Sequence, residues 1–145
     1  MKEIIAPIDR ELLLAELTKD KLLRRTNAGD NDIYLVDAHD SPNMMLEIGR
    51  LREITFRQAG GGTGKEVDID EYDTAAVPFK QLIVWDPEKQ ELISAYRFIL
   101  GRDVPLDENG YPHTPTSKLF HFSPEFIENQ WQRTIELGRS FVQPK

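Results

Sequence analysis

The stretch Leu92-Ile-Ser-Ala-Tyr-Arg-Phe-Ile-Leu100 decides the fold, because it reads as a long buried strand with a cation at its centre. A second stretch, Thr134-Ile-Glu-Leu-Gly-Arg-Ser-Phe-Val142, has the same character and carries Glu136 and Arg139. An unpaired buried ion is strongly destabilising, so these charges should be paired with one another or should hold a polar ligand. The acidic run at positions 68–73 offers the carboxylates that such cations need.

Side chains alternate between the two faces of a strand, which fixes where these charges are expected to point. Arg97 should share its face with Ile93 and Ile99. Glu136 and Arg139 are three residues apart, so we expect them on opposite faces of their strand.

The rest of the chain predicts a mixed α/β (α+β) domain in which a mostly antiparallel sheet is flanked by helices. Cap and proline signals begin helices at Asp9, at Ser41-Pro42 and at Ser123-Pro124. The expected helices are 9–18, 42–58 and 123–130, and the expected strands are 21–26, 33–36, 81–85, 92–100 and 133–142.

The predicted helix 42–58 carries an unusual stripe of Met45, Gly49, Arg52 and Phe56 at helical spacing. This stripe could cradle a ligand, or it could be the edge of the packed face with Arg52 reaching water. The residue pattern favours the second interpretation.

The glycine-rich segment Ala59-Gly-Gly-Gly-Thr-Gly64 invites comparison with a phosphate-binding loop. It follows a helix instead of joining a strand to a helix, and it lacks the Gly-Lys-Ser/Thr ending of that motif. We therefore interpret it as a helix stop followed by a mobile loop.

Composition excludes several classes of function. The chain has 145 residues, enough for a single domain, and a net charge of −7, which argues against nucleic acid as a partner. It has no cysteine, and its three histidines are scattered, so we expect no metal site. It has no signal-peptide core and no apolar run of about 20 residues, so a cytoplasmic location is expected.

Two interpretations of the charged residues carry equal weight on the residue pattern alone. Arg97 and one of Asp70, Asp73 or Glu136 could form a buried ion pair that fixes packing. Alternatively, these groups could hold an amino acid substrate while one carboxylate relays a proton, since a bidentate Arg suits a carboxylate.

The order and spacing of four motifs resemble a branch of the GNAT superfamily. The motifs are Arg52-x-x-x-Phe56, Asp70-x-x-Asp73, Ala95-Tyr-Arg97 and Glu136-x-x-Arg139, and the resemblance covers roughly residues 45–145. This branch contains the acyl-carrier-dependent N-acyltransferases of ornithine and glycine lipid synthesis, often labelled hemolysin-like. The acyl-homoserine-lactone synthases are related to it.

The resemblance implies an enzyme that transfers a (3-hydroxy)fatty acyl group to the α-amine of an amino acid, glycine or ornithine. Its partners would be that amino acid and an acyl carrier protein; the acyl thioester, on the carrier or on CoA, is a co-substrate, and no other cofactor is implied. Glu136 would be the catalytic base or water-positioning group. The implied substrate-binding residues are Arg52, Phe56, Asp70, Asp73, Arg97 and Arg139.

The resemblance also implies that residues 1–145 form one domain, the acceptor-side half of a GNAT-like fold. In that fold the strand matching 134–142 precedes a loop and helix that hold the acyl donor, and the chain ends at Lys145. We therefore expect this piece alone to be inactive, with an exposed edge strand prone to self-association into a homo-oligomer. Peripheral contact with the inner membrane is a further expectation.

Three alternatives compete with the aminolipid enzyme. A lactone synthase usually has Ser before the final Arg, where this chain has Gly138. A glycerolipid O-acyltransferase needs a His with Asp five residues on, which none of the three histidines provides. A non-catalytic, hemolysin-like membrane-interacting protein would need a cationic amphipathic helix or an apolar span, and neither is evident.

Overall fold

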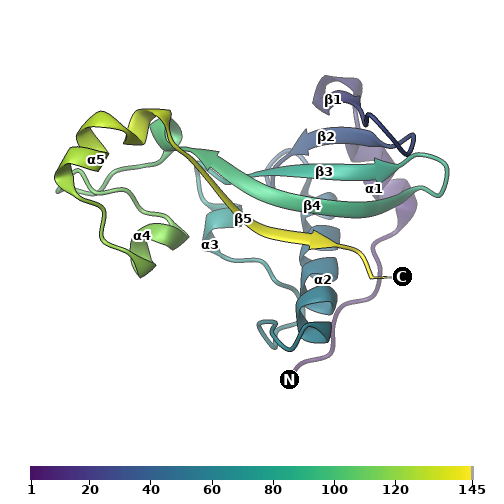
Figure 1. Ribbon diagram of the computed structural model, residues 1–145. Helices are drawn as coiled ribbons and strands as arrows, with labels where there is room; N and C mark the ends of the chain where they lie inside the picture. Colours follow the sequence, from purple (N-terminus) through teal and green to yellow (C-terminus); the bar gives the residue numbers. More distant parts are fainter. Residues whose placement is uncertain (145) are drawn as a thin grey trace.

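The computed structural model describes residues 1–144, and in this range one antiparallel sheet has the strand order β1-β2-β3-β4-β5 (Figure 1). The strands are β1 (Leu22–Arg25), β2 (Asp32–Val36), β3 (Lys80–Asp86), β4 (Glu91–Leu100) and β5 (Ile135–Val142). The α-helices are α1 (Arg10–Glu16), α2 (Pro42–Gln58), α3 (Glu71–Thr74), α4 (Pro115–Leu119) and α5 (Pro124–Asn129). The predicted mixed α/β class, with an antiparallel sheet flanked by helices, is confirmed.

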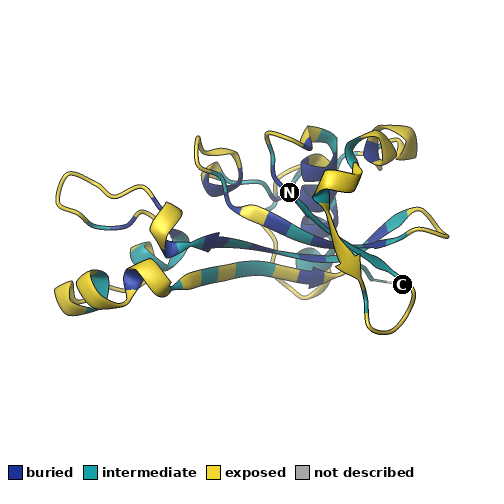
Figure 2. Ribbon diagram, turned by 90° about the horizontal axis from the view of Figure 1, so that it is seen from above, coloured by how far each residue is buried: buried dark blue, intermediate teal, exposed yellow. Residues whose placement is uncertain are grey.

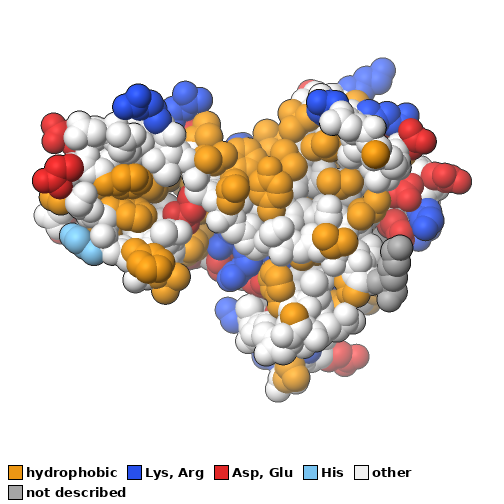
Figure 3. All heavy atoms as spheres, viewed as in Figure 1, with side chains coloured by type: hydrophobic (Ala, Val, Ile, Leu, Met, Phe, Trp, Pro, Cys, Tyr) orange, Lys and Arg blue, Asp and Glu red, His pale blue; other side chains and the backbone are white. Residues whose placement is uncertain are grey.

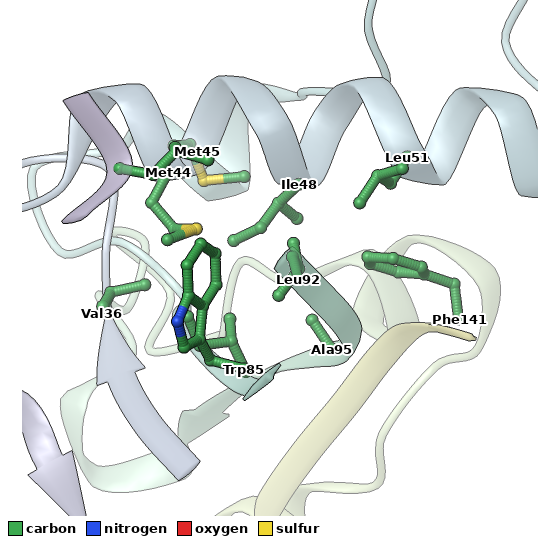
Figure 4. Packing of buried hydrophobic residues seen from close by; sticks show 11 residues of the cluster. Val36, Met44, Met45, Ile48, Leu51, Trp85, Leu92, Ala95 and Phe141 are labelled. Carbon is green, nitrogen blue, oxygen red and sulfur yellow. The ribbon is translucent and has the colours of Figure 1, made fainter. Parts of the chain in front are cut away.

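Helix α2 packs across one face of the sheet, which we call the inner face, and forms the main core with it (Figure 4). Met44, Ile48 and Leu51 of the helix point toward Trp85 of β3 and Phe141 of β5, all of them buried. This contact holds α2 against the inner face of the sheet, the face to which Arg97 of β4 points.

Residues 101–133 form a lobe beyond one end of the sheet, and Trp131 of this lobe belongs to a second, smaller core that also contains Tyr72 of α3 and Ile99 of β4. The helices of this lobe are largely exposed, whereas the strands and α2 hold most of the buried positions (Figure 2). The surface excursion predicted for residues 101–117 belongs to this lobe.

The outer face of the sheet is apolar as well. Figure 3 shows hydrophobic side chains gathered over the strands on the side away from α2. Ile135 and Leu137 of β5 are among the exposed hydrophobic residues, with half or more of their surface accessible. Among residues 1–144, no helix is long and apolar enough to cross a bilayer.

The predicted helix starts are confirmed, but the capping of α2 differs from expectation. Asp9 caps α1 by accepting a hydrogen bond from the backbone N–H of Glu11. Ser41 makes no such bond to α2. Glu16, at the end of α1, accepts from the backbone N–H groups of Asn43 and Met44 at 3.0 and 2.7 Å instead. A carboxylate is favoured at a helix N-terminus, so a residue distant in sequence can supply the cap.

A bulge in β4 corrects one predicted side-chain direction. Val84 lies opposite Ser94, whereas Trp85 lies opposite Leu92, so β4 has one extra residue at Ile93. Leu92 is therefore buried and Ile93 is not, while Arg97 and Ile99 point to the inner face as predicted.

A second bulge, in β5, corrects a prediction that matters for the site. Arg97 lies opposite Gly138 and Ala95 opposite Phe141, which leaves one extra residue in β5. Arg139 occupies this bulge with a φ of 51°, a left-handed conformation that is uncommon for a residue with a side chain. The bulge turns Arg139 to the inner face, so Glu136 and Arg139 do not point to opposite faces.

Candidate functional site

A fully buried ion pair lies between α2, α3 and β3. Arg52 donates to both carboxylate oxygens of Asp73, at 3.0 and 3.3 Å, and neither side chain is exposed. Gln81 completes this cluster, because it accepts from Arg52 at 2.8 Å and donates to Asp73 at 3.0 Å. Arg52 also donates to the backbone carbonyl of Asp68. The interpretation that Arg52 reaches water at the edge of the packed face was wrong.

The Asp70-x-x-Asp73 spacing forms the start of α3. Asp70 accepts from the backbone N–H groups of Tyr72 and Asp73, and Asp73 accepts from the N–H of Asp70, which is a reciprocal capping box. This motif holds both carboxylates side by side on α3, facing the inner face of β4.

Arg97 joins these two carboxylates. It donates to the two oxygens of Asp70 at 2.7 and 2.9 Å, and it lies 3.1 Å from Asp73. Its guanidinium carbon lies 4.9 Å from the centre of the Phe79 ring. Burial alone would raise the pKa of Asp70, but the hydrogen bonds and charge of Arg97 hold that pKa at about 2. Asp70 is therefore ionised at neutral pH.

Arg139 and Asp68 form the outer end of the cluster. The Nε of Arg139 lies 3.4 Å from Asp68, and its Nη2 lies 3.5 Å from Asp70. The Arg139 side chain is 36% exposed, whereas that of Asp68 is 2% exposed. Burial raises the pKa of Asp68, against the opposing charges of Arg139 and Arg52. Arginines and aspartates alternate along the cluster, in which neighbouring groups lie close together in the order Arg52, Asp73, Arg97, Asp70, Arg139, Asp68.

A pocket of about 480 Å³ opens beside this outer end, between the end of α2 and β5. Phe56 of α2 lies on one side of it, and Asp68 and Arg139 bring a carboxylate and a guanidinium to it. The glycine-rich segment 59–64 supplies the remaining wall through Ala59, Gly61, Gly62 and Thr63. The pocket thus offers one group of each charge beside an aromatic ring.

Glu136 lies on the inner face but outside this ion-pair network. Its register partner is Ile99, two residues along β4 from Arg97 toward the lobe. Its carboxylate accepts from the backbone N–H of Thr116 in α4, at 3.2 Å. The structure thus brings Arg52, Asp70, Asp73, Arg97 and Arg139 together and sets Phe56 at the adjoining pocket. The catalytic and substrate-binding roles of these residues stay predictions.

The stripe on α2 is explained residue by residue. Met45 is in the core, Arg52 is in the buried ion pair and Phe56 is at the pocket. Gly49 allows close approach of the chain carrying the acidic run, because a Cβ there would lie 2.6 Å from the Ile69 side chain. The backbone N–H of Asp68 donates to the carbonyl of Gly49 at 3.0 Å.

Sequence reasoning missed three residues of the site. Gln81 could have been found, because a polar residue stands two and four positions before the inward-facing Ile83 and Trp85. Asp68 was included in the acidic run but not distinguished from its neighbours. Glu53, which is fully buried on α2 and binds segment 59–64, left no signal in the pattern. Among residues 1–144, no cluster of three or more potential metal ligands is present.

Comparison with known proteins points to one family. The acetyltransferase (GNAT) domain family matches residues 51–145. A glycine N(alpha)-acyltransferase of Bacteroides thetaiotaomicron is 58% identical over 142 residues, covering 98% of this chain and 42% of that protein. A glycine N(alpha)-acyltransferase of Phocaeicola vulgatus is 56% identical over 142 residues, covering 98% of this chain and 44% of that protein.

The chain therefore spans less than half the length of these curated relatives. No solved structure gives a significant match. The family match extends from α2 through β5 and so includes every residue of the charged cluster and of the adjoining pocket. The chain belongs to the GNAT acetyltransferase family.

Proposed function

We propose that this chain forms the amino-acid-binding part of an N-acyltransferase that transfers a fatty acyl group from a thioester to the α-amine of glycine. Family membership and the names of the two relatives support acyl transfer to glycine. The observation that carries the proposal is the pairing of Arg139 with Asp68 beside the pocket. A free amino acid is a zwitterion, and these two groups match its carboxylate and its ammonium group.

The chemistry needs no enzyme nucleophile. The amine nitrogen, once deprotonated, attacks the thioester carbonyl carbon, the C–N bond forms and the C–S bond breaks. The amine proton passes to a base, and the leaving thiolate takes up a proton to become the free thiol. The protein has to orient the two substrates and accept a proton.

Two carboxylates are candidates for the proton acceptor. Asp68 lines the pocket, and burial raises its pKa above the ordinary value, which makes its carboxylate a stronger proton acceptor. Glu136 is the residue that the family resemblance indicates, and it lies nearer the lobe. The pocket position favours Asp68.

The finer features of the sequence prediction belong to the same proposal. They are a (3-hydroxy)acyl carrier protein donor, a place in aminolipid synthesis, the hemolysin-like branch, and a cytoplasmic protein that contacts the inner membrane peripherally. In this proposal Arg52, Asp73 and Arg97 hold the site in shape, and Phe56, Asp68 and Arg139 lie closest to the acceptor. Asp70 lies between the two sets, beside Arg97 and Arg139.

The test incubates the protein, in the longest form that its gene encodes, with a 3-hydroxyacyl carrier thioester and either glycine or ornithine. Mass spectrometry should detect N-acylglycine. Replacement of the proton acceptor, by Asp68→Asn or Glu136→Gln, should lower turnover by roughly 10²–10⁴-fold. The carboxylate whose replacement causes the smaller loss of turnover has a packing role. Absence of product with every amino acid would refute the proposal.

A further inference from the structure

The glycine-rich segment 59–64 is held by backbone hydrogen bonds to α2 at its start and by one buried carboxylate of α2 at its end. Glu53 is fully buried on α2, one turn before the helix ends. It accepts hydrogen bonds from the backbone N–H and the hydroxyl of Thr63, at 3.0 and 2.7 Å, and from the N–H of Gly64, at 2.8 Å. The sequence prediction of a mobile loop did not include this attachment.

Arg57 strengthens the same attachment from the next turn of α2. Its Nε donates to Glu53 at 2.7 Å, and its Nη2 donates to the carbonyl of Lys65 at 2.7 Å. Burial by itself would raise the pKa of Glu53, but the hydrogen bonds from Thr63 and Arg57 hold it at about 2. Glu53 therefore keeps its charge, and with it the capacity to accept all four hydrogen bonds.

The segment itself is shaped to lie against these two side chains. Gly62 has a φ of 92°, and a Cβ there would lie 2.8 Å from Arg57 and 3.1 Å from Glu53. Only glycine fits this close approach without a shift. Gly61, Gly62 and Thr63 then form one wall of the pocket that contains Phe56, Asp68 and Arg139.

We infer that Glu53 is a positioning residue for the amino acid acceptor, which acts by fixing segment 59–64 as the wall of the acceptor pocket. It does not touch the substrate itself. The inference rests on the proposed function, because the pocket has to be the acceptor site for its wall to affect glycine binding. It assigns the glycine-rich segment a role in acceptor binding in place of the phosphate role excluded on its sequence.

Glu53→Gln is the informative substitution, because it keeps the shape and removes the charge. A Gln side chain has one acceptor oxygen, so its NH₂ group faces either the two donors of Thr63 or those of Arg57 and Gly64. Glu47→Gln is the matched control on the same helix. Glu47 is also buried and is paired with Arg50, but its carboxylate accepts from Ile8 and lies outside the pocket.

The experiment measures backbone hydrogen exchange of residues 60–65 and glycine affinity by calorimetric titration in the wild type and both variants. Glu53→Gln should speed exchange in this segment and weaken glycine binding, each by about tenfold or more. Glu47→Gln should leave both within about twofold of the wild type.

Each outcome distinguishes the inference from the proposed function. Faster exchange with unchanged glycine affinity in Glu53→Gln overturns the inference and leaves the proposed function intact. Unchanged exchange overturns it as well, because Glu53 then does not hold the segment. Absence of glycine binding in the wild type refutes the acceptor site itself, and the positioning role falls with it.

Discussion

The two ends of the charged cluster differ in what surrounds them, although both consist of an arginine beside an aspartate. At the inner end, Arg52 and Asp73 are fully buried, and both form a hydrogen bond with Gln81. At the outer end, Arg139 is 36% exposed and meets Asp68 at 3.4 Å, beside a pocket. The inner end thus has the properties of a structural ion pair, whereas the outer end presents the partly exposed guanidinium of Arg139 to a pocket.

The sharpest contrast should appear in stability. Arg52→Met removes one partner of the fully buried pair and leaves Asp73 with only part of its compensation, so it should lower the free energy of unfolding by about 3–5 kcal/mol. Urea denaturation of wild type and variant measures this loss. A loss below about 1 kcal/mol would show that the inner end is not structurally important.

Arg139→Gln should show the opposite balance. Because the Arg139 side chain is partly exposed, the stability loss should stay below about 1 kcal/mol. Glycine affinity should fall by about tenfold or more, since the substrate carboxylate loses its charged partner. Calorimetric titration and urea denaturation of the same variant provide both values. Unchanged affinity would remove Arg139 from the acceptor site.

The pH dependence of stability should reveal which carboxylates stabilise the folded state in their ionised form. The pKa values of Asp70 and Glu53 are lowered to about 2 from ordinary values of 3.8 and 4.5. A lowered folded-state pKa stabilises the protein above the ordinary value, and this stabilisation is lost as pH falls toward the lowered one. Unfolding free energy should therefore fall between about pH 4.5 and pH 2.

Asp68 should act with the opposite sign in the same experiment. Its pKa is raised, so its ionisation at higher pH costs stability, and its protonation on acidification recovers it. Asp68→Asn should therefore make the acid loss of stability steeper, whereas Glu53→Gln should make it shallower. Identical slopes in both variants and the wild type would contradict these assignments.

The smallest expected contrast is between two glycines that lie beside the charged cluster, Gly49 and Gly138. Gly49→Ala should be destabilising on balance, because its Cβ would lie 2.6 Å from Ile69 and overpacking costs more than the gain in helix propensity. Gly138→Ala should stay within about 0.5 kcal/mol of the wild type, since its Cβ would meet only the Arg97 side chain, at 3.8 Å. Thermal denaturation of the two variants, compared with the wild type, tests the difference.

The sequence predicted most of the elements because their signals are local. The proline-capped starts of α2 and α5, the hairpin of β3 and β4, and the pairing of Arg97 with the acidic run all follow from caps, periodicity and charge. The inward direction of Arg97 also followed from simple alternation, because the bulge in β4 lies before it, at Ile93.

The errors arose where tertiary contacts override local patterns. The bulge at Arg139 turns its side chain from the predicted face of β5 to the inner face, and no alternating pattern reveals a bulge in advance. Arg52 was assigned to the surface because its buried partners, Asp73 and Gln81, lie 21 and 29 residues away in the sequence. Glu53 could not be recognised either, since three of the four hydrogen bonds that it accepts come from a loop beyond the helix.

The most direct test of the account is a set of calorimetric titrations with glycine and with two singly charged analogues, ethylamine and propionate. In these analogues a methyl group replaces the carboxylate or the ammonium group of glycine. If the outer end holds a zwitterion between Arg139 and Asp68, glycine should bind and each analogue should bind about tenfold more weakly or worse. Equal binding of glycine and one of the analogues, or no binding of glycine, would contradict the assignment of this pocket as the acceptor site.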